Sequence, residues 1–165
     1  MKSVLLVLVI TFLSFLLLAC DSKINIVWIF DDANVLTQEQ ISKFDSLYKS
    51  HEKETTNEIA LVTTSNYYPD TSLLMFAVNF GRSHGIGKKG KDNGVVIVFN
   101  GTRQETMIST GYGTEKILRD EIVKKIIDSL MLPNFKKGKT FEGLWEGSLA
   151  IVKFLEKPEN KIESK

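Results

Sequence analysis

The five consecutive apolar residues Val95-Val96-Ile97-Val98-Phe99 place the strongest constraint on the fold of this chain of 165 residues. An unbroken run of β-branched and aromatic side chains predicts a buried strand. Asn100-Gly101 follows at once and is typical of a tight hairpin turn with positive φ angles. We therefore expect residues 103–110 to return as an antiparallel, more polar strand near an edge of the sheet.

Two apolar segments nearer the N-terminus predict further strands, at residues 24–30 and 58–64. Between them, Thr37 and Gln40 have the spacing of a capping box, so we expect a helix that begins there and runs to about His51. A helix that joins two strands in this way forms a crossover connection and favours parallel pairing.

Three more helices are predicted from apolar periodicity. Their expected extents are about residues 71–80, with Asp70 or Thr71 as the cap; 118–130, with Asp120 as the cap and an end before Pro133; and Thr140 to Leu155, with Gly147 close to a neighbouring helix. The element order is therefore β-α-β-α-β-β-α-α. This order predicts an α/β fold, a three-layer α/β/α sandwich with a mixed four-stranded sheet.

The N-terminal segment has the pattern of an export signal. Met1-Lys2-Ser3 is a short basic start, residues 4–18 are almost entirely apolar, and a polar region follows. Cys20 is the only cysteine and follows Leu17-Leu18-Ala19. This stretch resembles the bacterial lipoprotein lipobox, which implies cleavage before Cys20 and its lipidation. An ordinary signal peptide or an uncleaved anchor is the alternative.

These features divide the chain into four expected parts. They are a lipoprotein signal peptide at residues 1–19, a lipidated N-terminus with a short linker at 20–25, a folded domain at 26–157 and a disordered charged tail at 158–165. Several acyl chains on one cysteine give stable membrane attachment. We expect the domain to be lipid-anchored to a bacterial membrane and to face the periplasm or the cell exterior.

The charge of the chain is balanced, with 21 Lys and Arg residues against 20 Asp and Glu residues. Removal of residues 1–19 takes away one of these charges, on Lys2. A nucleic-acid partner requires a basic excess or a basic stripe on the surface, so we expect none. A single cysteine also excludes a disulfide framework.

Residues 85–90, Gly-Ile-Gly-Lys-Lys-Gly, match the glycine spacing of a dinucleotide-binding loop. That mechanism requires a strand before the loop and a helix after it, so that the pyrophosphate meets a helix N-terminus. Here the expected order is the reverse, because a helix precedes the loop and the strand at 95–99 follows it. We therefore expect no dinucleotide.

Four short motifs resemble those of the TPM domain family, in order and in matching secondary structure. They are Asp31-Asp32-Ala33-Asn34-Val35-Leu36-Thr37; Gly85-Ile86-Gly87 leading to Lys91-Asp92-Asn93-Gly94-Val95; Gly111-Tyr112-Gly113-Thr114-Glu115 leading to Leu118 and Asp120; and Pro133-Asn134-Phe135 with Gly138 and Gly143. The resemblance covers about Ile26 to about Leu155. One departure is His84, where members often carry Trp.

The resemblance implies an exported or membrane-anchored protein of the bacterial envelope, or of the thylakoid lumen in other members. Such proteins are often labelled phosphatases, and divalent-cation binding is associated with them. Both properties are therefore expectations that come from the resemblance. Activity varies within such families, so the label alone does not assign a reaction.

A first acidic cluster, Asp31 and Asp32, follows the first predicted strand. In open parallel sheets, ligands bind in the crevice at the carboxyl ends of the strands, which favours a cation site here. The alternative is that both carboxylates hydrogen-bond the backbone of the turn. The sequence gives these two interpretations equal weight.

A second acidic cluster combines Asp92 and Asn93 with Glu115 and Asp120. The loop before the third strand and the break at Gly111-Tyr112-Gly113 lie at the same end of the antiparallel hairpin, so they can meet. Glycines there allow backbone groups to turn towards a ligand. The alternative is an ordinary turn before the strand and a helix cap at Asp120.

Carboxylate and amide oxygens suit Ca²⁺ or Mg²⁺ as the cofactor. Parallel first and third strands would place the two clusters at opposite ends of the sheet, as separate sites. Lys91 and Arg103 are candidate phosphate contacts and Tyr112 is a candidate ligand contact, although cross-strand pairing also explains Arg103. Cys20 is used for lipidation, and His51 and His84 are expected at the surface. No catalytic residue is therefore assigned.

The first functional hypothesis is a lipid-anchored module that binds a divalent cation and serves the assembly or maintenance of envelope complexes through a protein partner. A metal-dependent phosphatase acting on phosphomonoesters is the alternative that the resemblance implies. A pure protein-interaction module, in which the acids are structural, is the third. We rank the binding module above the enzyme because the sequence shows no evident nucleophile.

Overall fold

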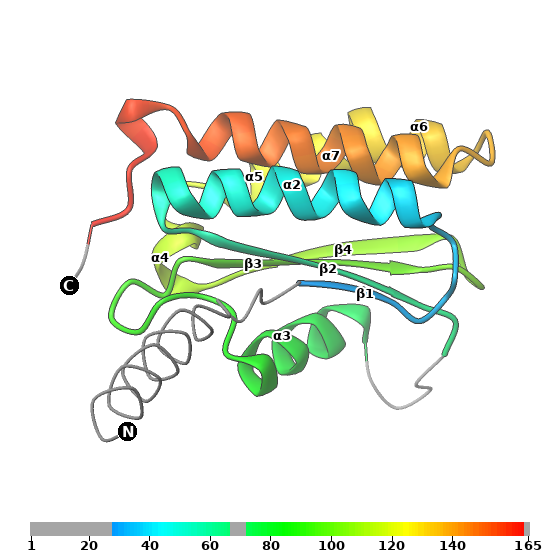
Figure 1. Ribbon diagram of the computed structural model, residues 1–165, viewed down its shortest axis with the longest axis horizontal. Coiled ribbons are helices and arrows are strands. Elements are labelled where there is room, and N and C mark those ends of the chain that lie inside the picture. Colours follow the sequence, from blue (N-terminus) through cyan, green and yellow to red (C-terminus); the bar gives the residue numbers. More distant parts are fainter. Residues whose placement is uncertain (1–27, 67–71, 164–165) are drawn as a thin grey trace, which may run out of the picture.

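The computed structural model describes residues 28–66 and 72–163 and contains one four-stranded sheet in the order β1-β2-β3-β4 (Figure 1). The strands are β1 (Ile29–Asp31), β2 (Glu58–Thr64), β3 (Gly94–Asn100) and β4 (Glu105–Thr110). β1, β2 and β3 are parallel, and β4 pairs antiparallel with β3. The predicted α/β fold with a mixed four-stranded sheet is confirmed.

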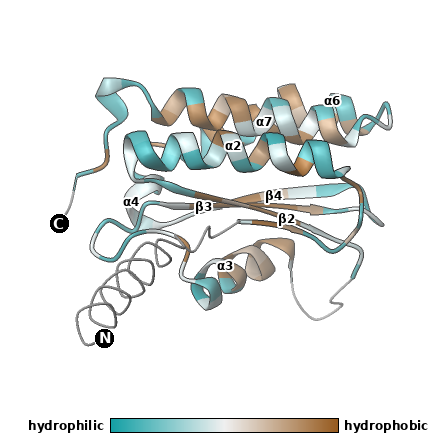
Figure 2. Ribbon diagram, viewed as in Figure 1, coloured by the Kyte–Doolittle hydropathy of each residue, from teal (hydrophilic) through white to brown (hydrophobic). Residues whose placement is uncertain are grey.

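Helices cover both faces of this sheet, but unequally (Figure 1). One face is covered by α2 (Gln38–Thr55), α5 (Asp120–Ile126), α6 (Leu132–Phe135) and α7 (Thr140–Leu155), and the other by α3 (Leu73–His84) alone. Side chains along β3 alternate between the faces: Val95, Ile97 and Phe99 belong to the larger core, whereas Val96 and Val98 belong to the smaller one. Figure 2 shows that the apolar segments of α2 and α7 lie together above the sheet.

α2 begins as predicted and ends later than predicted. The Thr37 side chain accepts from the Gln40 N–H, and the Gln40 side chain accepts from the Thr37 N–H, which confirms the capping box. The helix continues to Thr55 and is closed by Thr56, at φ +66°, whose N–H donates to Glu52. Burial of His51 against the rest of the domain extends the apolar face past the expected end.

The turn between β3 and β4 differs from the prediction. The strands pair as far as Asn100 and Glu105, so residues 101–104 form a four-residue loop. Its positive φ, +55°, is at Gln104, and the Asn100 side chain accepts from the Arg103 N–H. The prediction of a tight turn with positive φ at Asn100-Gly101 is wrong, because Asn100 uses its side chain to form a local turn instead.

The segment from Asp120 to Phe135 is helical beyond Pro133, where an end was predicted. A π-helical stretch, η1 (Ile127–Met131), connects α5 to α6, and the Leu132 N–H donates to Ile127 O. This wider turn allows Pro133, which has no N–H to donate, to enter the first turn of α6. Arg119, rather than Asp120, is the N-cap residue of α5.

Ser72 caps α3, with its side chain accepting from the Met75 N–H, so the predicted cap at Asp70 or Thr71 is wrong. Gly147 lies against Met131, where a Cβ atom would be 2.7 Å from the methionine side chain, and the predicted close approach is confirmed. Residues 158–163, expected to lack structure, begin with η2 (Pro158–Asn160) and bury Ile162.

The predictions for residues 1–27 lie outside the described residues. They include the signal peptide, the lipidation of Cys20 and most of the first predicted strand. In the part of the chain that the structure describes, no helix is both long enough and apolar enough to cross a membrane.

Candidate functional site

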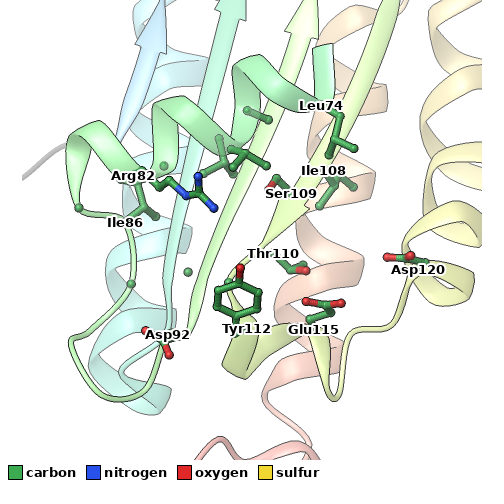
Figure 3. A pocket seen from close by; sticks show the side chains of 18 residues that line it. Leu74, Arg82, Ile86, Asp92, Ile108, Ser109, Thr110, Tyr112, Glu115 and Asp120 are labelled. Carbon is green, nitrogen blue, oxygen red and sulfur yellow. The ribbon is translucent and has the colours of Figure 1, made fainter. Parts of the chain in front are cut away.

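A cleft of about 470 Å³ lies between α3 and the end of the sheet where β3 begins and β4 ends (Figure 3). α3 and the glycine loop at residues 85–87 form one wall. The other wall is formed by the end of β4, the short helix α4 (Tyr112–Glu115) and the first residue of α5. Its floor is apolar, with Val96 and Ala77 among the lining residues.

Backbone hydrogen bonds join the two loops that sequence reasoning expected to meet. The Gly111 N–H donates to Gly94 O, and the Gly113 N–H donates to Asp92 O. A Cβ atom on Gly113 would lie 1.9 Å from Lys91 O, so only glycine permits this approach. Asp92 itself has φ +52°, which turns its carbonyl towards α4. The predicted meeting of these loops is confirmed.

Three acidic side chains of the second predicted cluster line this cleft: Asp92, Glu115 and Asp120. Figure 3 shows Glu115 and Asp120 on one side of Tyr112 and Asp92 on the other side. Glu115 and Asp120 also line a shallow depression on their outer side. Within residues 28–66 and 72–163, no group of three or more Asp, Glu, His or Cys side chains is arranged to hold a metal ion.

This arrangement suits a cation that keeps several water ligands better than a cation that is fully surrounded by protein oxygens. Ca²⁺ takes six to eight oxygen ligands, whereas Mg²⁺ keeps several waters and is commonly bound by one or two carboxylates. Glu115 and Asp120 supply two exposed carboxylates beside one opening. The residues that could hold a cation here are therefore Glu115 and Asp120, with water completing the shell.

Arg82 is a lining residue of the cleft that sequence reasoning missed. It lies in the last turn of α3 and is exposed, and Figure 3 shows its guanidinium pointing into the cleft. The spacing Leu74-Val78-Gly81-Arg82 along α3 is the signal that could have identified it, because these residues share one side of the helix. The cleft thus contains one cationic side chain as well as three acidic ones.

Two predicted site residues in the loop between α3 and β3, Lys91 and Asn93, do not line the cleft. Asn93 is fully buried, accepts from the Lys88 N–H and donates to Thr56 O and Asn57 Oδ1. The Lys91 ammonium donates to Thr56 Oγ1 at 2.9 Å. Both residues therefore attach the loop to the segment between α2 and β2, and neither lines the cleft.

The loop between α3 and β3 is also held in place by a network of charged side chains. The buried Glu58 carboxylate accepts from the Gly87 N–H at 2.6 Å and from the Lys88 ammonium. Lys88 also donates to Glu52 at 2.6 Å. Hydrogen bonds to Glu52 and Glu58 raise the pKa of Lys88 above its usual value, so the ammonium stays charged.

The first predicted cluster lies at the other end of the sheet. Asp31 Oδ1 accepts from the Val35 N–H and from Thr63 Oγ1, and Oδ2 accepts from the Leu36 N–H. Asp32 is exposed beside this turn. Arg103 also lies at this end and forms an ion pair of 3.0 Å with Glu105. The structure therefore brings none of these three residues to the cleft.

The two histidines have different environments. His51 is fully buried, with Nδ1 3.0 Å from Glu156, so its expected place at the surface is wrong. Burial lowers the pKa of His51. His84 is exposed, and its ring stacks on Phe80 at a centroid distance of 3.9 Å and contacts Phe30 edge-on. His84 therefore serves as an aromatic side chain in the packing of α3 against β1.

A family model described as the TPM domain matches residues 29–154. The N-terminal domain of a Porphyromonas protein (P. gingivalis), solved by NMR, is 26% identical, with a TM-score of 0.76 and coverage of 87% of this chain and 90% of that chain. No curated protein matches the chain.

Two further NMR structures are similar in fold alone. BA42 from Bizionia argentinensis is 18% identical, with a TM-score of 0.61 and coverage of 79% of this chain and 91% of that chain. The N-terminal domain of cg2496 from Corynebacterium glutamicum is 7% identical, with a TM-score of 0.62 and coverage of 82% of this chain and 84% of that chain.

Proposed function

This chain belongs to the TPM domain family, and from that premise we propose that it is a lipid-anchored module of the bacterial envelope that binds a divalent cation in the cleft beside α3. Cation binding there would serve the assembly or maintenance of an envelope complex rather than turnover of a substrate. Mg²⁺ is the first candidate and Ca²⁺ the second, for the coordination reasons given above.

One observation carries this proposal: acidic side chains from three separate segments line a single cleft. Asp92, Glu115 and Asp120 come from the loop before β3, from α4 and from α5. Glycines at positions 94, 111 and 113 allow the close backbone approach that brings these segments together. A structural role for the acids would not need them to share one opening.

A lipid anchor at Cys20 would fit an envelope role, because the segment between it and the folded domain is short. Cys20 precedes the first described residue, Trp28, by eight positions. A chain of that length spans at most about 30 Å when fully extended. Lipidated Cys20 would therefore keep the start of the folded domain close to the membrane surface.

A phosphatase is the second candidate, and Arg82 is the observation that favours it. Guanidinium groups bind phosphate oxygens, and Arg82 lines the same cleft as the acids. A bound cation would polarise the phosphoryl group. Hydrolysis of p-nitrophenyl phosphate that is lost on chelation and on Arg82→Ala would support this candidate, and hydrolysis that survives both changes would contradict it.

The cation proposal is tested by titrating MgCl₂ or CaCl₂ into residues 20–165 carrying Cys20→Ser, with amide chemical shifts as the readout. We expect shifts at Glu115, Asp120 and Tyr112 that are lost in the Glu115→Gln/Asp120→Asn variant. Glu142→Gln, at an exposed acid on α7 that lines neither the cleft nor the outer depression, is the control and should titrate as the parent protein does. Absence of movement in these loops at millimolar cation would contradict the proposal.

A further inference from the structure

The outer edge of β4 is an unpaired edge of the sheet. β4 is last in the strand order, and no other described strand pairs with it. The Gly111 N–H donates to Gly94 O, so the hydrogen-bonded positions of β4 alternate from Gly111 through Ser109 and Met107. The backbone groups of Thr110 and Ile108 therefore point away from β3, where they are available to a further strand.

This edge runs beside the cleft. Five consecutive residues at the end of β4 and beyond it, 108–112, line the cleft on one side, and α3 forms the opposite wall. Ile108 packs in the core on the far face of the sheet, so a cleft that also reaches Ile108 extends around the strand edge. The result is a groove between a helix and an open strand.

Exposed apolar side chains stand at both ends of the groove. Leu74 is 47% exposed and Tyr112 is 67% exposed, and both line it. Figure 3 shows Leu74 beside Ile108 at one end and Tyr112 at the other. Among the described residues, Met75 is the only other large apolar side chain that is exposed. The groove therefore offers apolar contacts along its length.

We propose that this groove binds an extended segment of a partner protein, which adds to β4 as a fifth strand and carries a basic side chain beside apolar ones. This inference rests on the proposed role of the cleft as a binding site and names the partner's chemistry. Strand addition supplies main-chain hydrogen bonds, and alternate side chains enter the cleft. The basic side chain follows from the charge of the cleft without a cation, because three acids and one arginine line it, and a bound divalent cation would compete with that side chain.

The first experiment uses two fluorescein-labelled peptides. One is Gly-Lys-Thr-Val-Thr-Val-Thr-amide, and in the other the central five residues are reversed to Val-Thr-Val-Thr-Lys. Lysine and both valines lie on one face of the extended peptide. We expect fluorescence anisotropy to show saturable binding of at least one peptide to residues 20–165 carrying Cys20→Ser. Replacing lysine by glutamate should weaken binding about tenfold, in keeping with the loss of a desolvated charge contact.

N-methylation of the peptide tests strand addition directly. Methylation at alternate residues removes only the donors that face β4, whereas methylation at the intervening residues leaves them intact. We expect one alternate set to weaken binding about fivefold for each lost hydrogen bond and the other set to have little effect. Equal effects from both sets would contradict strand addition.

The neighbouring residues Leu74 and Met75 provide a matched pair of protein variants. Leu74 lines the groove and Met75 does not, although both are exposed in the first turn of α3. Leu74→Asp should weaken peptide binding about tenfold, and Met75→Asp less than about twofold. The same charge is added at the same helix turn, so a common effect on folding cancels between the two variants.

Several outcomes would overturn the inference: no saturable binding of either peptide, equal losses from Leu74→Asp and Met75→Asp, or a concentration-dependent dimer that pairs β4 with a second copy. Failure of the cation proposal can be distinguished from failure of this inference, because cation binding is measured by the magnesium and calcium titrations without peptide. Peptide binding without cation binding would retain this inference and remove the cation role. Cation binding without peptide binding would retain the cation role and overturn this inference.

Discussion

Acidic residues stand at both ends of the sheet, and the two ends use them differently. At the end where β1 stops, the Asp31 carboxylate accepts hydrogen bonds from two backbone N–H groups and from Thr63. At the end where β3 begins, Glu115 and Asp120 are exposed and line the cleft. The first end is held together by its carboxylate, and the second by close backbone contacts at glycine. Acids that look alike in sequence are therefore distinguished by whether the chain itself uses their hydrogen-bonding capacity.

The largest loss of stability is expected when the glycine contact at the cleft is removed. Gly113→Ala places a Cβ atom against Lys91 O, so we expect the free energy of unfolding to fall by about 3 kcal/mol and the cleft to be disrupted. Urea denaturation measures the loss. Gly90→Ala is the control: it has φ +81° and no heavy atom within 4 Å, so backbone strain alone should cost about 1–2 kcal/mol.

The opposite end should respond to its carboxylate. Asp31→Ala leaves the Val35 and Leu36 N–H groups without their acceptor, and we expect a loss of about 2 kcal/mol in the free energy of unfolding. Asp32→Ala, at the exposed neighbouring position, should change stability by less than about 0.5 kcal/mol. If Asp31→Ala also abolished cation binding while Glu115→Gln did not, the assignment of the two ends would be reversed.

The buried His51 makes the stability of the domain depend on pH. Burial lowers its pKa in the folded state, so the unfolded chain takes up a proton more readily. The free energy of unfolding is therefore highest, as far as His51 is concerned, above the unfolded pKa of about 6.5. It decreases as the pH falls below that value, because the unfolded chain then binds a proton at His51. Denaturation midpoints between pH 7.5 and 5 should show this fall, and His51→Gln should reduce it. An unchanged slope in the variant would assign the dependence to other groups.

The smallest effect is expected from the acids of the cleft on stability itself. Exposed carboxylates without backbone partners contribute little to folding, so Glu115→Gln/Asp120→Asn should change the free energy of unfolding by less than about 0.5 kcal/mol. The same variant should lose cation binding. A destabilisation comparable to that of Asp31→Ala would mean that these acids are structural, and the difference between the two ends would disappear.

The sequence predicted the parts of the fold that depend on local patterns. The run at 95–99, the capping box at Thr37 and the crossover order were sufficient for the sheet and its helices. The four-residue loop after Asn100 and the π-helical stretch before Pro133 were missed, because several backbone solutions fit the same residues there. His51 is buried and is paired with Glu156, which is distant in sequence, so no local pattern could indicate this environment.

The candidate site was predictable only in part. Asp92, Glu115 and Asp120 were placed together because hairpin topology brings their loops to one end of the sheet. Arg82 was not, because its position depends on how α3 crosses the sheet, which periodicity does not determine. Asn93 was placed at the site because its amide suits a cation, whereas tertiary hydrogen bonds to Thr56 and Asn57 use that amide elsewhere.

The unequal covering of the sheet has a consequence for motion. The core beneath α3 contains four fully packed residues, Val62, Ala77, Val96 and Val98, whereas the core on the other face is several times larger. Local opening follows the weakest packing, so α3 should detach from the sheet at lower free energy than α2 or α7. Amide hydrogen exchange should therefore be fastest, among the long helices, in the wall of the cleft. Occupancy of the groove would slow that exchange, which makes α3 a reporter of binding even before the occupant is identified.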